Sequence, residues 1–381
     1  MKKPTVLYFG KMDFPFNNAS ACRVGGICSA LKNDFVCKAY GYSKNGLSHG
    51  YFDGVEFENY KYPKSLFSYL LTFGRNRRIK KVLRSFNPKD IGAVFFTSIG
   101  HFQLKFLGKW CKKNKVPFIY DCGDLNIKSD KGILFRIIKY IEEKRFQKAV
   151  LKYSAVMAIS SYLSSYYAKA KHVFVVPCIA DVASQRFDGE PEKLAENSIN
   201  IGYFGIPGKD FTKDRLDWCL EAFKRVSNSH INFYIAGISE NELPAKCRSI
   251  RNVIYLGKIS NNKCVSIIKS LDFVTFFREN TKITKAGFAS KITESFCLNT
   301  PLLTNLTGDM DKYLNDKNSV FVNGVDFESC LNLFDRLSNI SKDEIFAMKS
   351  YLMKNNPLNA FYWSEFLIEN LNIIKEKILI N

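Results

Sequence analysis

Short apolar segments alternate with amphipathic helical patterns along this chain, and the alternation is interrupted once before it starts again. The first apolar segment, Val6–Phe9, is followed by a helical pattern over Ala19–Leu31. Strands that alternate with helices favour a parallel sheet with helices on both faces. The first half therefore predicts one doubly wound α/β domain, with strands at Val6–Phe9, Ile91–Phe96, Val116–Tyr120, Ala155–Ile159 and His172–Val176 and helices at Ala19–Leu31, Phe102–Lys113, Ile133–Leu151 and Ser161–Ala168.

A polar segment, Asp181–Ser198, separates the two runs of alternating elements and contains Gly189-Glu190-Pro191-Glu192. A cluster of such residues indicates a linker between domains. We therefore predict two Rossmann-like domains, residues 1–182 and 183–358, and a final amphipathic helix over 359–381 that crosses back to the first domain. The strands expected in the second domain are Ile199–Phe204, Ile231–Ala236, Val253–Leu256, Asp272–Phe277, Pro301–Thr304 and Ser319–Val322.

The net charge of +20 is concentrated in the first half of the sequence. Residues 1–185 contain 31 Lys and Arg against 12 Asp and Glu, whereas residues 186–381 contain 25 against 24. A cationic domain attracts anionic partners, which include nucleic acid, an anionic membrane surface and a lipid-linked diphosphate. No recognition motif for nucleic acid accompanies the charge, so nucleic acid is the least favoured of these partners.

Several features favour a cytoplasmic protein. The sequence has no run of about 18 apolar residues, and the apolar segment near its start ends at Gly10, as expected for a strand rather than a secretory signal. The eleven cysteines include no C-x-x-C pair, which favours reduced thiols. The four histidines are not spaced for a zinc site. We therefore expect neither a metal nor another cofactor.

The stretch from Arg278 to Asn305 carries the strongest functional signal. A predicted strand runs into a polar loop, which ends at a short helix with Lys291 and Glu294, and the next strand follows at once. In open α/β sheets ligands bind outside the carboxyl ends of the strands, and helix N-termini suit phosphate. Lys291 adds a positive charge, and Glu294 can accept hydrogen bonds from a sugar diol. This combination predicts a nucleotide-sugar pocket, although residues at this spacing also form surface ion pairs.

This stretch resembles the C-terminal signature of the retaining GT-B glycosyltransferases of family four. The resemblance lies in AGFASKITE, residues 286–294, and in NTPLL, residues 299–303. It implies two Rossmann-like domains facing a cleft, and a glutamate, here Glu294, that binds the nucleotide ribose. The family's first glutamate falls at Ala286, so loop backbone groups, Arg278 or Glu279 are expected to replace its contacts with the donor sugar. The donor-binding residues predicted in this stretch are Arg278, Gly287, Phe288, Ala289, Ser290, Lys291 and Glu294. For Arg278, which lies at the carboxyl end of its predicted strand, the alternative is an ordinary loop charge.

The segment Gly205–Asp214 follows the first strand of the second domain and predicts a further phosphate contact. A glycine-rich turn that leads into a helix with a nearby lysine can hold a diphosphate. In the resembled family a lysine of this segment contacts donor phosphate, and Lys213 is the best match. The family's arginine after the first glycine is replaced by Ile206, so Lys209 is the candidate to substitute for it. The alternative for either lysine is a solvated loop position.

The first domain carries the candidates for binding the acceptor. Asn18, Ala19 and Ser20 occupy a segment that resembles the family's first βα loop, where small residues allow substrate to approach closely. Ser20 is a candidate N-cap. Gly25 and Gly26 fall inside the helical pattern that follows, where close packing of the helix on the sheet is the favoured explanation.

Three residues of the first domain are predicted to act near the reacting atoms. Asp121 and Asp124 follow the strand Val116–Tyr120, where the resembled family often has D-x-H-D, and Gly123 replaces the histidine. Two carboxylates there could bind acceptor hydroxyls or act as a base, while the structural alternative is that Asp121 caps the next turn. His101, which follows another predicted strand, is the third candidate.

Two further patterns bear on metal and membrane binding. Asp309-Met310-Asp311 looks like a metal-binding D-x-D, but aspartate also suits the start of a helix, and the resembled family needs no metal. Basic stretches at Arg75–Arg84 and Lys105–Lys115, the first preceded by the apolar Leu66–Phe73, indicate docking to an anionic membrane. The alternative is that these charges form a solvated face.

Together these observations predict a cytoplasmic, membrane-peripheral glycosyltransferase that is metal-independent and, by its resemblance, retaining. It would move a sugar from a nucleoside-diphosphate sugar to a glycan acceptor, carried on a lipid diphosphate at the inner face of the membrane. The expected pathway is synthesis of a bacterial surface polysaccharide such as capsule, O-antigen or exopolysaccharide. The alternatives are a non-catalytic protein that binds sugar nucleotides or polysaccharide and, less favoured, a nucleic-acid-binding protein.

Overall fold

The chain forms two compact units in the computed structural model, which describes residues 2–43, 46, 48–62, 76–125, 133–226 and 230–380. Unit 1 comprises Met1–Asp181 together with Ala360–Asn381, and unit 2 comprises Val182–Asn359. The predicted domain boundaries lie one residue away from these. Among the described residues, no helix combines the length and the apolar composition needed to cross a membrane.

Unit 1 contains an eight-stranded sheet in the order β3-β4-β2-β1-β5-β6-β7-β8. All neighbouring strands are parallel except β3 and β4. The chain leaves β1 toward β2 on one side and later returns to β5 on the other, so the strand order reverses between β1 and β5. The strands are β1 (Thr5–Gly10), β2 (Val36–Ser43), β3 (Ser48–Phe52), β4 (Val55–Lys61), β5 (Ile91–Thr97), β6 (Phe118–Cys122), β7 (Ala155–Ala158) and β8 (Val173–Val175).

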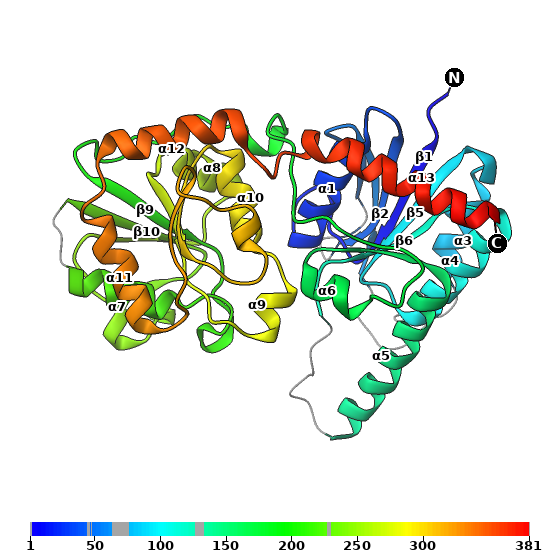
Figure 1. Ribbon diagram of the computed structural model, residues 1–381, viewed down its shortest axis with the longest axis horizontal. Coiled ribbons are helices and arrows are strands. Elements are labelled where there is room, and N and C mark those ends of the chain that lie inside the picture. The colour runs from blue at the N-terminus through cyan, green and yellow to red at the C-terminus, as the bar shows by residue number, and fades with distance from the viewer. Residues whose placement is uncertain are drawn as a thin grey trace. The chain divides into compact units, whose positions relative to one another are not determined.

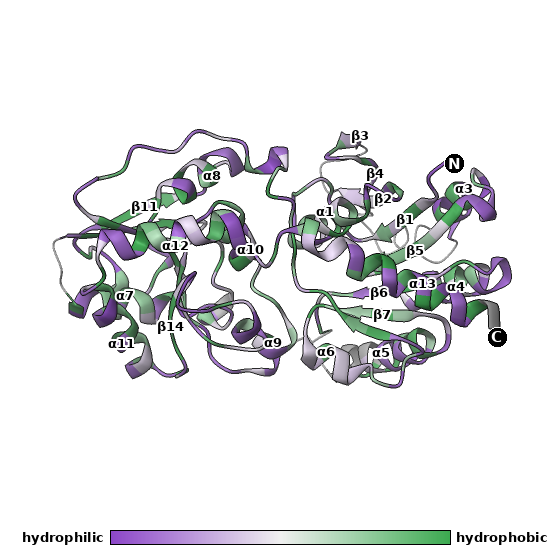
Figure 2. Ribbon diagram, turned by 45° about the horizontal axis from the view of Figure 1, so that its top comes forward, coloured by the Kyte–Doolittle hydropathy of each residue, from purple (hydrophilic) through white to green (hydrophobic). Residues whose placement is uncertain are grey.

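The helices of unit 1 cover this sheet, and the C-terminal helix is one of them. α13 packs along α1 (Figure 1), where Leu367, Leu371 and Ile374 join the same apolar core as Val24 and Ile27. Strands β5 and β7 are almost entirely hydrophobic (Figure 2), as expected for strands buried on both faces. The helices are α1 (Ala19–Leu31), α3 (Arg77–Arg84), α4 (His101–Asn114), α5 (Ile133–Tyr153), α6 (Ser161–Tyr166) and α13 (Ser364–Ile380).

Unit 2 contains a six-stranded parallel sheet in the order β11-β10-β9-β12-β13-β14. Here the order reverses between β9 and β12, which are neighbours in the sheet. The predicted ranges of β9, β10 and β14 agree with the structure to the residue. The strands are β9 (Ile199–Phe204), β10 (Ile231–Ala236), β11 (Val253–Gly257), β12 (Phe273–Phe276), β13 (Leu302–Asn305) and β14 (Ser319–Val322).

Helices lie on both faces of the second sheet. Figure 1 shows α7 and α11 together on one face and α8, α10 and α12 on the other. The rings of Phe223 on α7, Phe233 on β10 and Phe334 on α11 contact one another, and all three side chains are buried. The helices are α7 (Leu216–Val226), α8 (Asn261–Ser270), α9 (Lys282–Ala286), α10 (Ser290–Cys297), α11 (Phe327–Leu337) and α12 (Lys342–Asn355).

Candidate functional site

The strongest candidate site lies in unit 2, outside the carboxyl ends of β9 and β12. The strand order reverses between these two strands, and this is the position where open α/β sheets bind ligands. β9 ends at Phe204 and is followed by Gly205, while β12 ends at Phe276 and is followed by Phe277 and Arg278. Two of the predicted donor-binding residues therefore come together because their strands are adjacent.

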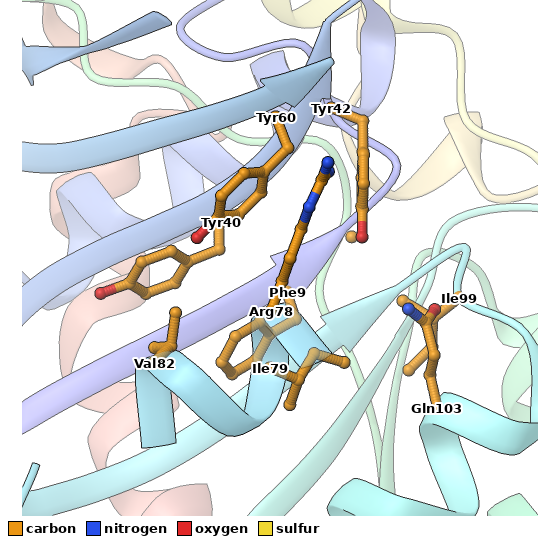
Figure 3. Close-up of a pocket in the computed structure, with 10 residues that line it drawn as sticks. Phe9, Tyr40, Tyr42, Tyr60, Arg78, Ile79, Val82, Ile99 and Gln103 are labelled. Carbon is orange, nitrogen blue, oxygen red and sulfur yellow. The ribbon is translucent and has the colours of Figure 1, made fainter. Parts of the chain in front are cut away.

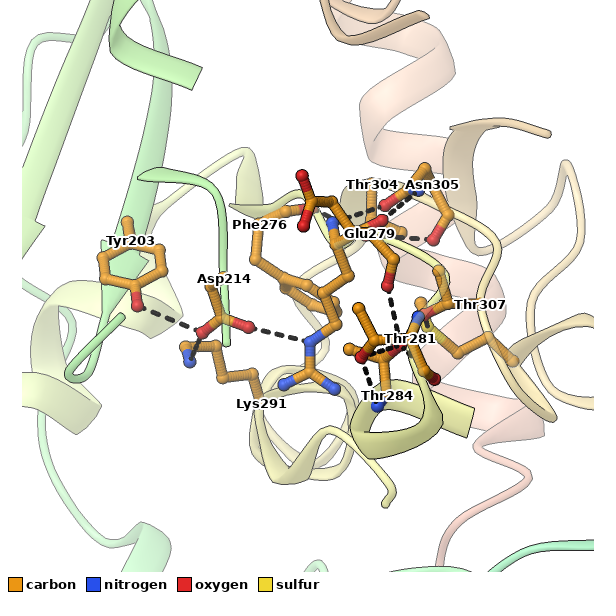
Figure 4. Close-up of polar contacts among 12 residues, drawn as sticks. Tyr203, Asp214, Phe276, Glu279, Thr281, Thr284, Lys291, Thr304, Asn305 and Thr307 are labelled. Atoms are coloured by element: carbon orange, nitrogen blue, oxygen red, sulfur yellow. Dashed lines mark hydrogen bonds and ion pairs between the residues drawn. The ribbon is translucent and has the colours of Figure 1, made fainter. Parts of the chain in front are cut away.

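A buried carboxylate, Asp214, organises this site (Figure 4). Its Oδ2 accepts a hydrogen bond from Lys291 Nζ at 2.6 Å, and its Oδ1 accepts one from Arg278 Nε at 2.7 Å. The hydroxyl of Tyr203 donates to Oδ2 at 3.1 Å. Asp214 is fully buried, and Arg278 and Lys291 are 5% and 9% exposed. Because two cations share one carboxylate, the cluster has an excess positive charge that suits an anionic ligand.

The environment of the cluster shifts the pKa values of its members. Burial alone would raise the pKa of Asp214, but the charges of Lys291 and Arg278 outweigh burial and hold that pKa well below its usual range. Burial lowers the pKa of Lys291, Asp214 opposes this change, and Arg278 adds to it. The pKa of Tyr203 is raised by burial and by Asp214. Asp214 therefore stays ionised, and it favours the charged form of Lys291.

Gly205 allows the ammonium group of Lys291 to lie against the chain after β9. Its φ is +135°, a backbone conformation that residues other than glycine rarely adopt. A Cβ at this position would lie 3.1 Å from Lys291 Nζ. The structure thus brings the predicted residues Gly205, Arg278 and Lys291 into one place.

The N-terminus of α10 lies at this site and includes the predicted residues Ala289 and Ser290. Ala289 is the N-cap residue, and its side chain does not cap the helix. Phe288 packs edge-to-face on Tyr313, with ring centroids 5.5 Å apart. Backbone N–H groups in the first turn of a helix are available to an anion when no side chain caps them.

A short helix that the sequence analysis did not predict, α9, precedes this turn. It ends at Ala286, and Gly287 is its C-cap with an ordinary φ of −86°. Ala286, which occupies the position of the resembled family's first glutamate, is fully buried. Glu279, one of the residues expected to replace that glutamate, pairs with Arg215 at 2.5 Å.

Glu294 forms an ion pair with Arg186, which the sequence analysis did not single out. Arg186 belongs to a one-turn helix, Gln185–Phe187, within the predicted linker, and Ser184 caps that turn. The contact engages Oε1 of Glu294, whose side chain is 30% exposed. No local pattern marks Arg186, because its partner lies 108 residues further along the chain.

Of the two candidate lysines in the segment after β9, only Lys213 has a side chain that the structure describes. Lys213 is exposed, and its backbone N–H donates to the carbonyl of Pro207 at 3.0 Å, which folds the loop back on itself. Its charge contributes to lowering the pKa of Lys291, so the two ammonium groups act on the same region. The side chain of Lys209 lies outside the described part of the chain.

In unit 1, the structure corrects the expected setting of Asp121. The residue lies inside β6, not after it, and therefore caps no turn. Its Oδ1 accepts a hydrogen bond from Arg23 Nε at 2.7 Å, and its Oδ2 accepts one from the hydroxyl of Tyr8. The Asp121 side chain is 1% exposed. Because both carboxylate oxygens are engaged in the core, this geometry favours a structural role.

The other two predicted catalytic residues lie nearer the surface. His101 begins α4, and its Nδ1 lies 2.8 Å from Oε1 of Glu142 on α5. Asp124 is exposed, and its Oδ1 accepts a hydrogen bond from the backbone N–H of Leu125 at 2.7 Å. His101 and Asp124 remain predictions for the acceptor side.

The N-cap of α1, the helix after the first βα loop, differs from the predicted one. Asn18, not Ser20, is the N-cap of α1, and its side chain accepts a hydrogen bond from the backbone N–H of Ala21. Ala19 and Ser20 are the first two helical residues. Close packing accounts for Gly26, because a Cβ there would lie 1.8 Å from the carbonyl oxygen of Ile179.

The remaining predictions concern metal and membrane binding. Asp309 lies 3.4 Å from Lys312 as an ion pair, at the turn Met310–Lys312. Within the described ranges, no group of acidic, histidine and cysteine side chains is arranged to hold a metal ion. The apolar stretch Leu66–Phe73 and Arg75 lie outside the described residues.

Comparison with known proteins agrees with this geometry. Residues 199–339 match the family model of glycosyl transferases group 1, and all residues of the Asp214 cluster lie within that range. The fold is GT-B. The second unit is therefore similar to a glycosyl transferase group 1 domain, and the motifs at residues 286–294 and 299–303 lie within the matched range. No curated protein sequence matches the chain.

Several solved GT-B structures are similar over nearly the whole chain. HepE of Anabaena, in complex with UDP, is 11% identical with a TM-score of 0.64, covering 97% of this chain and 99% of HepE. Sucrose-phosphate synthase of Thermosynechococcus elongatus is 10% identical with a TM-score of 0.65, covering 99% and 100%. A UDP-forming α,α-trehalose-phosphate synthase of Burkholderia xenovorans is 11% identical with a TM-score of 0.64, covering 97% and 99%.

Proposed function

We propose that this protein is a retaining glycosyltransferase that uses a nucleoside-diphosphate sugar. The observation that carries the proposal is the pair of cations, Lys291 and Arg278, held by buried Asp214 at the switch point of a glycosyl transferase group 1 domain. UDP is the proposed nucleotide. This choice is supported by HepE, which was solved with UDP and with UDP plus glucose, and by an E. coli trehalose-6-phosphate structure bound with UDP-2-fluoro glucose.

In this proposal the site stabilises the departing diphosphate. Lys291, Arg278 and the N-terminus of α10 supply positive charge where negative charge develops as the bond to the sugar breaks. Lys213, exposed on the adjacent loop, provides a further charge for the same group. Arg186 holds Oε1 of Glu294, so Oε2 is the atom proposed to accept from the ribose. The acceptor hydroxyl then attacks the same face of the sugar, which retains its configuration, and no metal is required.

Unit 1 is proposed to bind the acceptor at the inner face of the membrane. Its excess of basic residues suits a lipid-linked diphosphate and an anionic surface. Helix α5 exposes Ile137, Tyr140 and Ile141 close to Lys144 and Arg145, a combination that suits the interface of an anionic membrane. On this basis we propose a lipid-carried glycan acceptor, in the synthesis of a bacterial surface polysaccharide.

Nucleotide binding tests this proposal most directly. UDP, GDP, CDP and ADP, each alone and as common sugar conjugates, are titrated into the wild-type protein and Lys291→Met while thermal stability is measured. A nucleotide at 100 times its Kd should add about 2.7 kcal/mol to the free energy of unfolding. Lys282→Met removes an equal charge from exposed α9 and is the matched control. If no nucleotide stabilises the wild type, or if both variants bind equally well, the proposed donor site is wrong.

A further inference from the structure

A hollow in unit 1 has a composition unlike that of the Asp214 cluster (Figure 3). It measures about 280 Å³, including space open to solvent. It lies between one face of the sheet and helix α3 and reaches the ends of β1 and β5, where the order of the first sheet reverses. The lining residues are Phe9, Gly10, Tyr40, Tyr42, Tyr60, Arg78, Ile79, Val82, Ile99 and Gln103.

The floor of this hollow is aromatic because neighbouring strands present rings in register. Phe9 of β1 pairs with Tyr40 of β2, and their rings stack with centroids 5.3 Å apart. Tyr42 of β2 pairs with Tyr60 of β4, with ring centroids 6.1 Å apart. Flat aromatic surfaces of this kind pack against the apolar faces of sugar rings as well as against other apolar groups.

Arg78 of α3 extends between two of these rings and is held there (Figure 3). Its guanidinium carbon lies 4.5 Å from the ring centre of Tyr60 and 5.6 Å from that of Tyr42. Its Nη1 is buried and has no hydrogen-bond partner among the described residues. A buried guanidinium N–H without an acceptor is costly, so it indicates a position for a ligand oxygen.

Gln103 of α4 supplies a second buried polar atom without a partner. The residue is 2% exposed, and its Oε1 has no hydrogen-bond donor in the parts of the chain that the structure describes. Arg78 can only donate, whereas Oε1 can only accept. A ligand that satisfies both atoms therefore carries an acceptor oxygen and a hydroxyl or N–H donor, and a negative charge on the acceptor oxygen would match Arg78.

We propose that this pocket binds an acidic sugar of the acceptor, with its carboxylate or phosphate on Arg78, a hydroxyl on Gln103 and its ring against the tyrosines. That the ligand is an acceptor rests on the proposed function, but its binding to unit 1 does not. A neutral sugar would leave the charge of Arg78 uncompensated. The carboxylate of a uronic acid and the phosphate of a sugar phosphate present the same chemistry to Arg78, and separate probes distinguish them.

The test is a calorimetric titration of the full-length protein without nucleotide, using glucuronate, glucose 6-phosphate and neutral glucose. We expect one of the two acidic sugars to bind at least about 10-fold more tightly than glucose, the ratio expected for one charge-assisted hydrogen bond. Arg78→Gln and Gln103→Glu should each remove this preference, the second by placing a negative charge beside the ligand. Arg77→Gln changes the net charge equally at an exposed neighbour and should preserve binding.

Three results would overturn the assignment: no binding of either acidic sugar at millimolar concentration, equal binding of glucose and the acidic sugars, or an equal loss in Arg77→Gln and Arg78→Gln. If Arg78→Gln does not fold, Gln103→Glu decides. UDP binding is measured for the same variants and should be unchanged. If the protein binds an acidic sugar but not UDP, the proposal for this pocket is supported and the proposed donor site is wrong. If it binds UDP but no acidic sugar, only the proposal for this pocket is wrong.

Discussion

Replacing Asp214 with asparagine should destabilise unit 2 severely. The carboxylate is fully buried and neutralises Lys291 at 2.6 Å and Arg278 at 2.7 Å, both of which are themselves buried. Removing one partner from a buried ion pair costs about 3–5 kcal/mol, because the remaining charges lose their compensation. An asparagine oxygen can still accept one of the hydrogen bonds, so we expect about 3 kcal/mol, the lower end of that range.

Calorimetry and hydrogen exchange measure this loss. A change of about 3 kcal/mol should lower the Tm of unit 2 by roughly 6–12 °C, since each kcal/mol shifts a domain of 150–250 residues by about 2–4 °C. Hydrogen exchange in peptides from β9 and β12 shows that the loss belongs to unit 2. The matched control is Glu221→Gln, which removes the same charge from a partly exposed residue paired with Arg225 and Lys246. Such surface pairs contribute at most about 1 kcal/mol.

The difference between wild type and Asp214→Asn should also depend on pH. Lys291 and Arg278 hold the pKa of Asp214 well below its usual range. A carboxylate whose pKa is lower in the folded state stabilises the fold fully above its unfolded pKa of about 3.9, and this contribution disappears as the pH falls toward the folded pKa. The difference in unfolding free energy should therefore be constant near pH 7 and shrink below about pH 4. Equal effects of Asp214→Asn and Glu221→Gln at pH 7 would refute the reasoning.

Three further predictions concern donor binding. Glu294→Gln should weaken UDP binding by about 10-fold, because a charge-assisted contact to the ribose is lost. Binding of 2′,3′-dideoxy-UDP, which lacks the ribose hydroxyls, should be nearly unaffected. Equal weakening of both nucleotides in calorimetry would contradict the assignment. Gly205→Ala should weaken UDP binding and cost about 1–3 kcal/mol of stability, because φ is +135° and the new Cβ meets Lys291. Gly257→Ala, at φ +62° with nothing within 4 Å, is its control and should leave binding intact. Sugar transfer should survive excess EDTA, since Lys291 and Arg278 supply the charge; a loss that Mn²⁺ or Mg²⁺ restores would exclude a metal-independent mechanism.

The parts of the fold that could be predicted from the sequence are those with a mostly apolar run. β9 and β10 are flanked by helices on both faces of their sheet, so nearly all their residues are apolar and their ends are marked by polar loops. β2 and β4 were not predicted because partly exposed and exposed residues interrupt their buried ones, so neither contains a continuous apolar run. β2 also contains Lys38 and two tyrosines, which interrupt the apolar pattern.

The candidate site could be predicted only where its residues lie near the end of a strand or the start of a helix. Gly205 follows β9 directly, Arg278 lies two residues after β12, and Lys291 is the second residue of α10, so the rule that ligands bind at carboxyl ends of strands was enough to place them together. Asp214 was not predicted as a site residue, because the sequence does not distinguish a buried aspartate in a polar loop from a solvated one. Its burial arises from contacts with Arg278 and Lys291, which lie 64 and 77 residues further along the chain.

Asp121 and Asp214, one in each unit, are both buried and have similar surroundings, but their effects on the local charge differ. Each accepts a hydrogen bond from a tyrosine on the first strand of its sheet, and each pairs with an arginine. In unit 1, Arg23 balances Asp121 one to one and donates from Nη1 to the carbonyls of Val176 and Pro177, so the pair fastens α1 to the segment after β8. In unit 2, Asp214 pairs with Lys291 as well as with Arg278, and the resulting excess positive charge lies beside the N-terminus of α10.

This difference bears on where the base for the acceptor hydroxyl can be found. A base needs a lone pair that substrate can reach, and neither oxygen of Asp121 meets this condition, because Arg23 and Tyr8 engage both and the side chain is 1% exposed. His101 meets it better. Glu142 contacts its Nδ1, which orients the ring and leaves Nε2 as the nitrogen available to a substrate. If His101 is the base, His101→Gln should lower kcat without lowering the Tm, whereas Asp121→Asn should act mainly through stability.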